Sequence, residues 1–373
     1  MAKRALYLSG GGARGAYQAG VLKGIQHIVP AQTIPVDILS CVSAGAINAA
    51  FIATYADDYA HGITKLAQLW SSLHCDNIYQ TNVLALLKSL LKNFFGIVSQ
   101  YQAKGGRYIL DTAPLKELLE QHLDFKKVNQ HIKNGLFSVF EVATTCYDLA
   151  EVISFYHSHL PQPGWQNIRH IAHPCEINCQ HILASAAFPL FFPTVEIDGL
   201  NFGDGSLRLS SPLRASIKLG ADKLLIIATR AAADINPLVE VPAVSSDISF
   251  SKIIGGMLNA LFLDSLDRDL ELLKKINRNL AAVPADIKAH LEWRNVEILD
   301  IRPTADLGKI AENYQHALPK LLSYTMTSLG SKGQSGDFLS FMLFEAEYCK
   351  QLVDLGYQDA LMNEERIREF FKD

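Results

Sequence analysis

The sequence predicts a three-layer α/β/α domain with a mainly parallel central sheet, and three observations lead to this class. Near the N-terminus, a short apolar strand ends in glycines and is followed by apolar residues at helical spacing (4–28). The same order returns at once, as a buried strand followed by a helix of small residues (36–56). A later run, "DKLLIIATR" (222–230), is also typical of a buried strand. Strand–helix alternation favours a parallel sheet that is covered by helices.

The other elements of the predicted core lie between these segments. Residues 58–130 show a mostly helical pattern. Two further apolar runs, 135–147 and 151–157, are expected to be strands. We therefore assign residues 1–231 to the core of the protein, and we expect its functional site at the ends of the strands.

The sequence changes character after Ala231. A proline-marked connector at 236–244 comes first. The patterns that follow predict helices at 250–281 and 337–372 around a short strand at 295–303. We expect residues 232–373 to form a mainly helical C-terminal extension that packs on the core.

Composition narrows the class of protein. The chain has 373 residues, of which 49% are hydrophobic and 19% charged, and its net charge is −4. These values are ordinary for a globular protein and give no basic face of the kind that nucleic-acid binding requires. Six cysteines spread thinly through the chain indicate reduced thiols in a cytoplasm-like compartment.

Neither a signal peptide nor a transmembrane helix is expected. The apolar run after Lys3 and Arg4 is too short for the core of a signal peptide. The longest uncharged stretch, 38–56, is long enough for a membrane span, but the polar and small residues in its first half favour a buried strand and helix. We expect a cytoplasmic protein, with contact at membrane surfaces left open.

The stretch "CVSAG" (41–45) places a serine between a strand and a helix. Ser43 has Gly45 two residues after it and Cys41 two residues before it. This is the arrangement of a nucleophile elbow, usually G-x-S-x-G, in which small neighbours permit a sharp turn. Cys41 stands where glycine is usual. Taken alone, the motif favours a serine that only caps a helix.

A run of glycines near the N-terminus favours a nucleophile at Ser43 over a serine that only caps a helix. Gly10, Gly11 and Gly12 present backbone N–H groups just ahead of a helix. An attacking serine creates an oxyanion, which N–H donors and a helix N-terminus stabilise. Losing one such donor typically costs about 3 kcal/mol of transition-state stabilisation.

A dinucleotide site is the rival interpretation of this loop. Gly10, Gly12 and Gly15 also fit G-x-G-x-x-G, and Asp37 lies at a suitable distance along the chain for a ribose contact. However, Asp37 precedes its strand where the motif needs an acidic residue after it, and Arg14 adds a bulky charge to the loop. Nucleotide binding remains a minor alternative.

The third motif is "DGS" (204–206), in a turn-rich stretch. Asp204 is flanked by Gly203 and Gly205. An isolated Asp-Gly is most often a solvated turn. Here it follows the apolar block "LASAAFPLFFP" (183–193).

Together these motifs resemble the bacterial patatin-like phospholipases. The resemblance covers most of the chain and rests on motifs in the family's order: "GGGARG" (10–15), "CVSAG" (41–45), "LASAAFPLFFP" (183–193), "DGS" (204–206), "LGADKLLIIATR" (219–230) and residues 335–360. Two positions depart from the pattern. Cys41 replaces the usual glycine, and Ser206 stands where the family commonly has glycine or alanine.

The resemblance implies a Ser–Asp dyad that acts through an acyl-enzyme without a cofactor or metal. Ser43 is then the nucleophile and Asp204 its base. The oxyanion hole is expected from the loop, namely Gly10, Gly11, Gly12, Arg14 and Gly15. Cys41, Gly45 and Gly205 are expected to support the elbow and the dyad loop. The implied substrate is a phospholipid or another acyl ester.

Several other interpretations stay open. A non-lipid esterase or thioesterase could use the same fold, and a catalytically silent lipid-binding protein would also fit. A Ser–His–Asp triad is possible in a chain with 12 histidines. The amphipathic segment 82–101 is expected to be a core helix, with an interfacial lid as the alternative. A zinc site in "HIAHPCEINCQH" (170–181) is disfavoured, because its C-x3-C spacing is not the usual C-x2-C.

Overall fold

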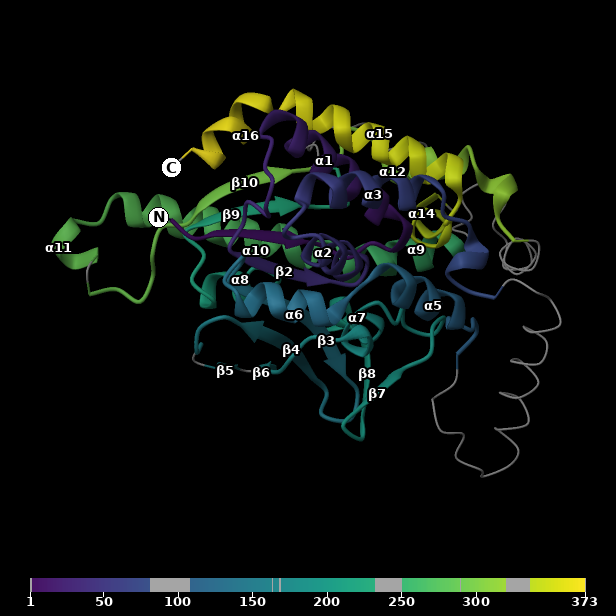
Figure 1. The fold of residues 1–373 in the computed structure, drawn as a ribbon, viewed down its shortest axis with the longest axis horizontal. Coiled ribbons are helices and arrows are strands. Elements are labelled where there is room, and N and C mark those ends of the chain that lie inside the picture. Colours follow the sequence, from purple (N-terminus) through teal and green to yellow (C-terminus); the bar gives the residue numbers. More distant parts are fainter. Residues whose placement is uncertain are drawn as a thin grey trace.

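The computed structural model shows a single mixed sheet with helices on both faces (Figure 1). The predicted amphipathic segment 82–101 and the connector 236–244 lie outside the described residues. The structure describes residues 2–80, 108–162, 164–167, 169–231, 250–288, 290–319 and 336–372.

The sheet is built around the first strand of the chain. Its strand order is β10-β9-β1-β2-β3-β4-β6-β5, and β8 pairs with both β3 and β7. The five strands from β10 to β3 are mutually parallel, whereas β4 and β8 run antiparallel to β3. The described strands are β1 (Arg4–Leu8), β2 (Ile38–Val42), β3 (Val139–Cys146), β4 (Glu151–Ser158), β5 (Gln166–Asn167), β6 (His170–Pro174), β7 (Val195–Ile197), β8 (Leu200–Asp204), β9 (Lys223–Ile227) and β10 (Glu297–Ile301).

Helices flank the sheet and connect its strands. The longer ones near the site are α1 (Gly15–Ile28), α2 (Ala44–Thr54), α3 (Tyr59–Ser71), α5 (Ala113–His122), α6 (Phe125–Lys133) and α7 (Cys179–Ser185). The remaining described helices are α8 (Arg214–Lys218), α9 (Phe250–Phe262), α10 (Asp264–Ala281), α11 (Ala285–Lys288), α12 (Leu307–Glu312), α14 (Gly336–Met342), α15 (Ala346–Met362) and α16 (Glu364–Phe371).

Alternating side chains of the central strands enter two separate cores. On β1, Leu6 and Leu8 pack with α1, α2 and α15, while Ala5 and Tyr7 pack with α8 and α10 on the other face. Every residue of β2 and β3 is buried, as expected for strands that are covered on both sides. The mostly parallel sheet flanked by helices confirms the predicted fold class.

The C-terminal part contributes to both the sheet and its cover. β10 pairs in parallel with β9 over its whole length. In Figure 1, α15 and α16 run along one side of the molecule over α1. The α1–α15 crossing is close, since a Cβ added to Gly20 would lie 2.0 Å from the carbonyl oxygen of Val353. The division of the chain at residue 231 stays a prediction.

Within the described residues, every helix is too short or too polar to cross a bilayer.

Candidate active site

Ser43 occupies a strained turn between β2 and α2. Its backbone has φ 56° and ψ −128°, a left-handed region that residues with a side chain seldom adopt. Gly45 permits the turn, because a Cβ there would lie 2.2 Å from the carbonyl oxygen of Leu8. Cys41 is fully buried, and its thiol donates to the carbonyl oxygen of Glu141 at 3.1 Å. The geometry is that of a nucleophile elbow.

Ser185 supports this turn, although no motif in the sequence singles it out. Its hydroxyl accepts a hydrogen bond from the N–H of Ser43 at 2.9 Å and donates to the carbonyl oxygen of Ala143 at 2.7 Å. The residue ends α7 and is fully buried. The elbow is therefore tied to both α7 and β3. The only sequence signal was its position in the block 183–193.

The glycine loop lies directly beside Ser43. A Cβ placed on Gly10 would be 3.1 Å from the Cβ of Ser43. Gly11 and Gly12 have φ values of 154° and 56°, which favour glycine. No described residue accepts a hydrogen bond from the N–H groups of Gly10, Gly11 or Gly12. Gly10 and Gly11 precede the short helical turn 12–14, which Gly12 begins and α1 follows. Because they have no described acceptor, these N–H groups are available for an anion.

Arg14 points away from the loop toward α14. Its Nε donates to the Ser340 hydroxyl at 2.8 Å, and its terminal nitrogen pairs with Asp337 at 3.1 Å. The guanidinium also lies over the ring of Phe341, 4.3 Å from the ring centroid. The side chain is almost fully buried. Arg14 thus joins the N-terminal loop to the C-terminal part through its described polar partners. That Arg14 helps to stabilise an oxyanion stays a prediction.

Sheet topology brings Asp204 to the elbow. Val42, which precedes Ser43, is paired with Ala143 on β3, and the next β3 residue, Thr144, is paired with Asp204 at the end of β8. The two residues at 43 and 204 therefore flank one point of β3, although they are far apart in the chain. A Cβ on Gly205 would lie 2.3 Å from the carbonyl oxygen of Ala143, which explains why a glycine follows the aspartate.

The Asp204 carboxylate is completely buried. Its Oδ1 accepts a hydrogen bond from the N–H of Ser206 at 2.9 Å. Burial raises the pKa of Asp204 to about 6, and the neighbouring hydroxyl of Ser43 and the Ser206 N–H partly oppose that rise. Oδ2 accepts no hydrogen bond of standard geometry from a described residue. A carboxylate of this kind is suited to accept a proton near neutral pH.

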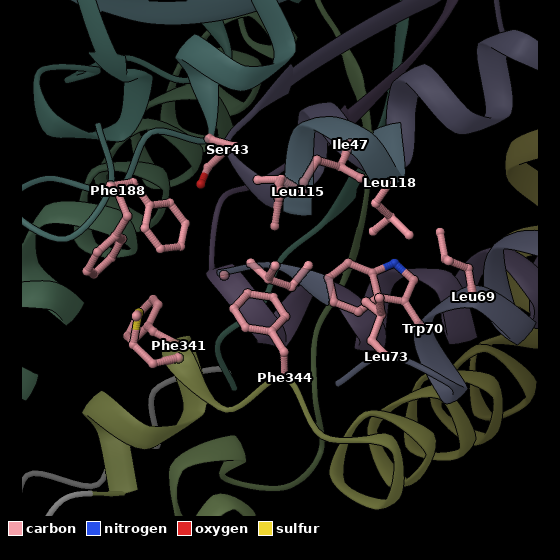
Figure 2. A pocket seen from close by; sticks show the side chains of 16 residues that line it. Ser43, Ile47, Leu69, Trp70, Leu73, Leu115, Leu118, Phe188, Phe341 and Phe344 are labelled. Carbon is pink, nitrogen blue, oxygen red and sulfur yellow. The ribbon is translucent and has the colours of Figure 1, made fainter. Parts of the chain in front are cut away.

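An apolar pocket begins at Ser43. Its empty volume is about 600 Å³, part of which is open to solvent. In Figure 2, the hydroxyl of Ser43 lies at one end, and Trp70 and Leu69 lie at the other. The walls come from six parts of the chain, namely the glycine loop, the elbow with α2, α3 and the segment after it, α5, the loop after α7, and α14 with the segment after it. The lining residues are Gly12, Ser43, Ala44, Ile47, Leu69, Trp70, Leu73, Ile78, Leu115, Leu118, Ala186, Phe188, Phe192, Phe341, Met342 and Phe344.

Asp37 does not lie near the glycine loop. It precedes β2, and its carboxylate accepts a hydrogen bond from the N–H of Arg4 at the start of β1, at 2.8 Å. Since β1 and β2 are parallel, Asp37 and the glycines that follow β1 lie at opposite ends of these strands. The predicted alternative of a ribose contact has no support from this geometry.

The His- and Cys-rich stretch 170–181 takes part in local packing. His170 contacts the Ser154 hydroxyl at 2.7 Å, and His181 lies 3.7 Å from the Cys175 sulfur. Over the ranges that the structure describes, no group of three His, Cys, Asp or Glu side chains could hold a metal ion. Within those ranges, the hydrogen-bond partners of Ser43 and Asp204 include no histidine.

The strained serine, the adjoining glycine loop, the buried aspartate and the apolar pocket agree with a comparison against known families. Residues 6–217, more than half of the chain, match the sequence model of the patatin-like phospholipases. The chain belongs to the patatin-like phospholipase family. This membership confirms the predicted resemblance.

Comparisons with individual proteins add less than the family match. The chain is similar to the crystal structure of VipD from Legionella pneumophila, with 13% sequence identity and a TM-score of 0.38. That similarity covers 98% of this chain and 67% of VipD. No curated protein matches the sequence. Membership of the patatin-like phospholipases therefore rests on the family match.

Proposed function

We propose that this patatin-like protein hydrolyses lipid acyl esters through a Ser43–Asp204 dyad and an acyl-enzyme. The observation that carries the proposal is the position of Ser43, strained in an elbow at one end of an apolar pocket and next to a buried carboxylate. Strain at a non-glycine residue is typical of functional sites. An apolar pocket suits a fatty acyl chain better than a small polar acid.

In the proposed acylation, Oγ of Ser43 attacks the ester carbonyl carbon while Oδ2 of Asp204 accepts the hydroxyl proton. The carbonyl oxygen becomes an oxyanion, which the free N–H groups of Gly10–Gly12 stabilise. As the tetrahedral intermediate collapses, the alcohol leaves with the proton from Asp204. The acyl chain remains on Ser43. Water then hydrolyses this ester and releases the fatty acid.

Contact with a lipid surface is part of the proposal. Leu190 lies between Phe188 and Phe192, which line the pocket, and 77% of its surface is exposed. An exposed apolar side chain next to the pocket is suited to enter the interface of a bilayer. Phospholipid is therefore the substrate that we favour over a water-soluble ester.

A fluorophosphonate probe tests the proposal directly, because it reacts with activated serines. Wild-type protein should be labelled on Ser43, and it should release fatty acid from phospholipid vesicles. Ser43→Ala should abolish both, with its folding checked by circular dichroism. Ser9→Ala offers a control on another buried serine of the same region. Labelling without release of fatty acid, together with turnover of soluble esters or thioesters, would favour a non-lipid esterase. Absence of labelling would indicate a silent lipid-binding protein.

A further inference from the structure

Two buried polar atoms beside the elbow make no hydrogen bond of standard geometry with a described residue. They are Oδ2 of Asp204 and Oγ of Ser206. The hydroxyl groups of Ser43 and Ser206 nevertheless lie close enough to the carboxylate of Asp204 to lower its pKa. Ser206 is 6% exposed and Asp204 is fully buried. Buried polar atoms ordinarily have protein or ordered water as partners, because an unpaired one costs free energy. Their common location next to a nucleophile points to a ligand that both can bind.

The side chain of Ser206 lies against the glycine loop and is bonded to Asp204 through its backbone. The N–H of Ser206 is bonded to Oδ1 of Asp204, which fixes the two residues relative to each other. A Cβ on Gly10 would lie 2.8 Å from Oγ of Ser206 and 3.1 Å from the Cβ of Ser43. The Ser206 hydroxyl and the Cβ of Ser43 thus both lie close to Gly10.

We propose that Ser206 positions the water that hydrolyses the acyl-enzyme. This inference rests on the proposed function. Once Ser43 carries the acyl group, its oxygen no longer donates to Asp204, so Oδ2 can accept a hydrogen bond from water. A single acceptor leaves the water free to rotate. A second bond to Oγ of Ser206 fixes its lone pair toward the acyl carbon.

The step balances without any further reactant. The water oxygen bonds to the carbonyl carbon of the Ser43 ester, and one water proton passes to Oδ2 of Asp204. The Ser206 hydroxyl keeps its own proton throughout. Collapse of the tetrahedral intermediate breaks the bond between Oγ of Ser43 and the acyl carbon. Oγ recovers the proton from Asp204, and the carboxylic acid leaves.

The test measures acylation and deacylation of Ser43 separately. Wild type, Ser206→Ala and Ser206→Gly are mixed with p-nitrophenyl decanoate in a stopped-flow instrument, and intact mass spectrometry measures the acyl adduct on Ser43. Both variants should release the first p-nitrophenol at the wild-type rate. Deacylation should slow about tenfold, the typical effect of one lost hydrogen bond, so the adduct should accumulate.

Ser216→Ala is the matched control. Ser216 is also a buried serine whose hydroxyl lacks a described partner, but it lies in α8 and outside the site. Its deacylation rate should equal that of wild type. Unchanged deacylation in both Ser206 variants would overturn the inference, and so would an equal slowing of acylation and deacylation, which indicates a structural or oxyanion role. If wild type itself forms no adduct and no product, the proposed function fails as well.

Discussion

The reactive site and the pocket wall differ in how the chain builds them. The reactive groups lie in short motifs that each end a strand, namely the glycine loop after β1, Ser43 after β2 and Asp204 at the end of β8. Beyond the glycine loop and the elbow with α2, the apolar wall combines α3, α5, the loop after α7 and the C-terminal α14. In the proposed function, each reactive group is held by the backbone geometry of its own motif, whereas the choice of acyl chain depends on packing between distant segments.

Of the substitutions that test this comparison, Asp204→Asn is expected to lower turnover the most. It tests whether Asp204, at the end of β8, is the base of the proposed dyad. Asparagine keeps the shape of the side chain but cannot accept the Ser43 proton. Turnover of p-nitrophenyl decanoate should fall about 10⁴-fold, as when the acid of a serine hydrolase triad is removed. Thermal unfolding should show that the variant is folded. Near-normal turnover in folded protein would exclude the dyad.

The pH dependence of kcat/KM also tests Asp204 as the base. Because burial raises the pKa of Asp204 to about 6, the carboxyl group is ionised above that pH and protonated below it. A protonated group cannot act as a base. We expect kcat/KM to be constant near pH 8 and to fall about tenfold for each pH unit below 6. A profile that stays flat down to pH 4 would remove Asp204 as the base.

Phe344→Ala tests the pocket wall. The ring of Phe344 lies 6.3 Å from that of Trp70 in a stacked pair, and both line the pocket. Loss of this apolar surface should lower kcat/KM for decanoyl esters about tenfold and leave acetyl esters nearly unchanged. Phe370→Ala, another buried phenylalanine but on α16 and outside the pocket, is the control. Equal losses for both chain lengths would mean that the ring supports the fold alone.

Cys41→Gly is expected to have the smallest effect. The thiol is fully buried, and burial raises its pKa, so it stays neutral and unreactive. Glycine is the usual residue of the elbow and fits the turn. Turnover should remain within about twofold of wild type. Complete inactivation in folded protein would give the thiol a role of its own.

The sequence predicted the reactive motifs because their constraints are local. A serine between a strand and a helix, with small neighbours, specifies its own turn, and glycines specify bare amides. The same holds for the central parallel strands, whose continuous apolar runs indicate burial on both faces. That Ser43 and Asp204 lie side by side could not be derived from these local constraints, because it depends on how the strands pair.

The features that could not be predicted from the sequence depend on contacts between distant parts of the chain. The support that Ser185 gives to the elbow requires α7 to lie over β3. Phe341 and Phe344 reach the pocket because α14 packs against the N-terminal loop, where Arg14 binds Ser340, and against α9 and α12. The short strands β6, β7 and β8 were not predicted. The equally short β2 and β9 are almost continuously buried and apolar, whereas β6, β7 and β8 are only partly buried and include polar residues, so they carry no such signal. In the structure, β6 pairs with β4, β8 pairs with β3, and β7 pairs with β8.

The place of β1 in the sheet has a consequence for biosynthesis. β1 leaves the ribosome well before one of its neighbours, β9. The bonded residues Lys3 and Asp222 at the start of this pairing are 219 residues apart in the chain. At 5–20 residues per second, roughly 10–40 s pass before that neighbour exists. During this time the nascent β1–β2 pair has an open, apolar edge, which is the kind of surface that chaperones cover and that aggregation exploits.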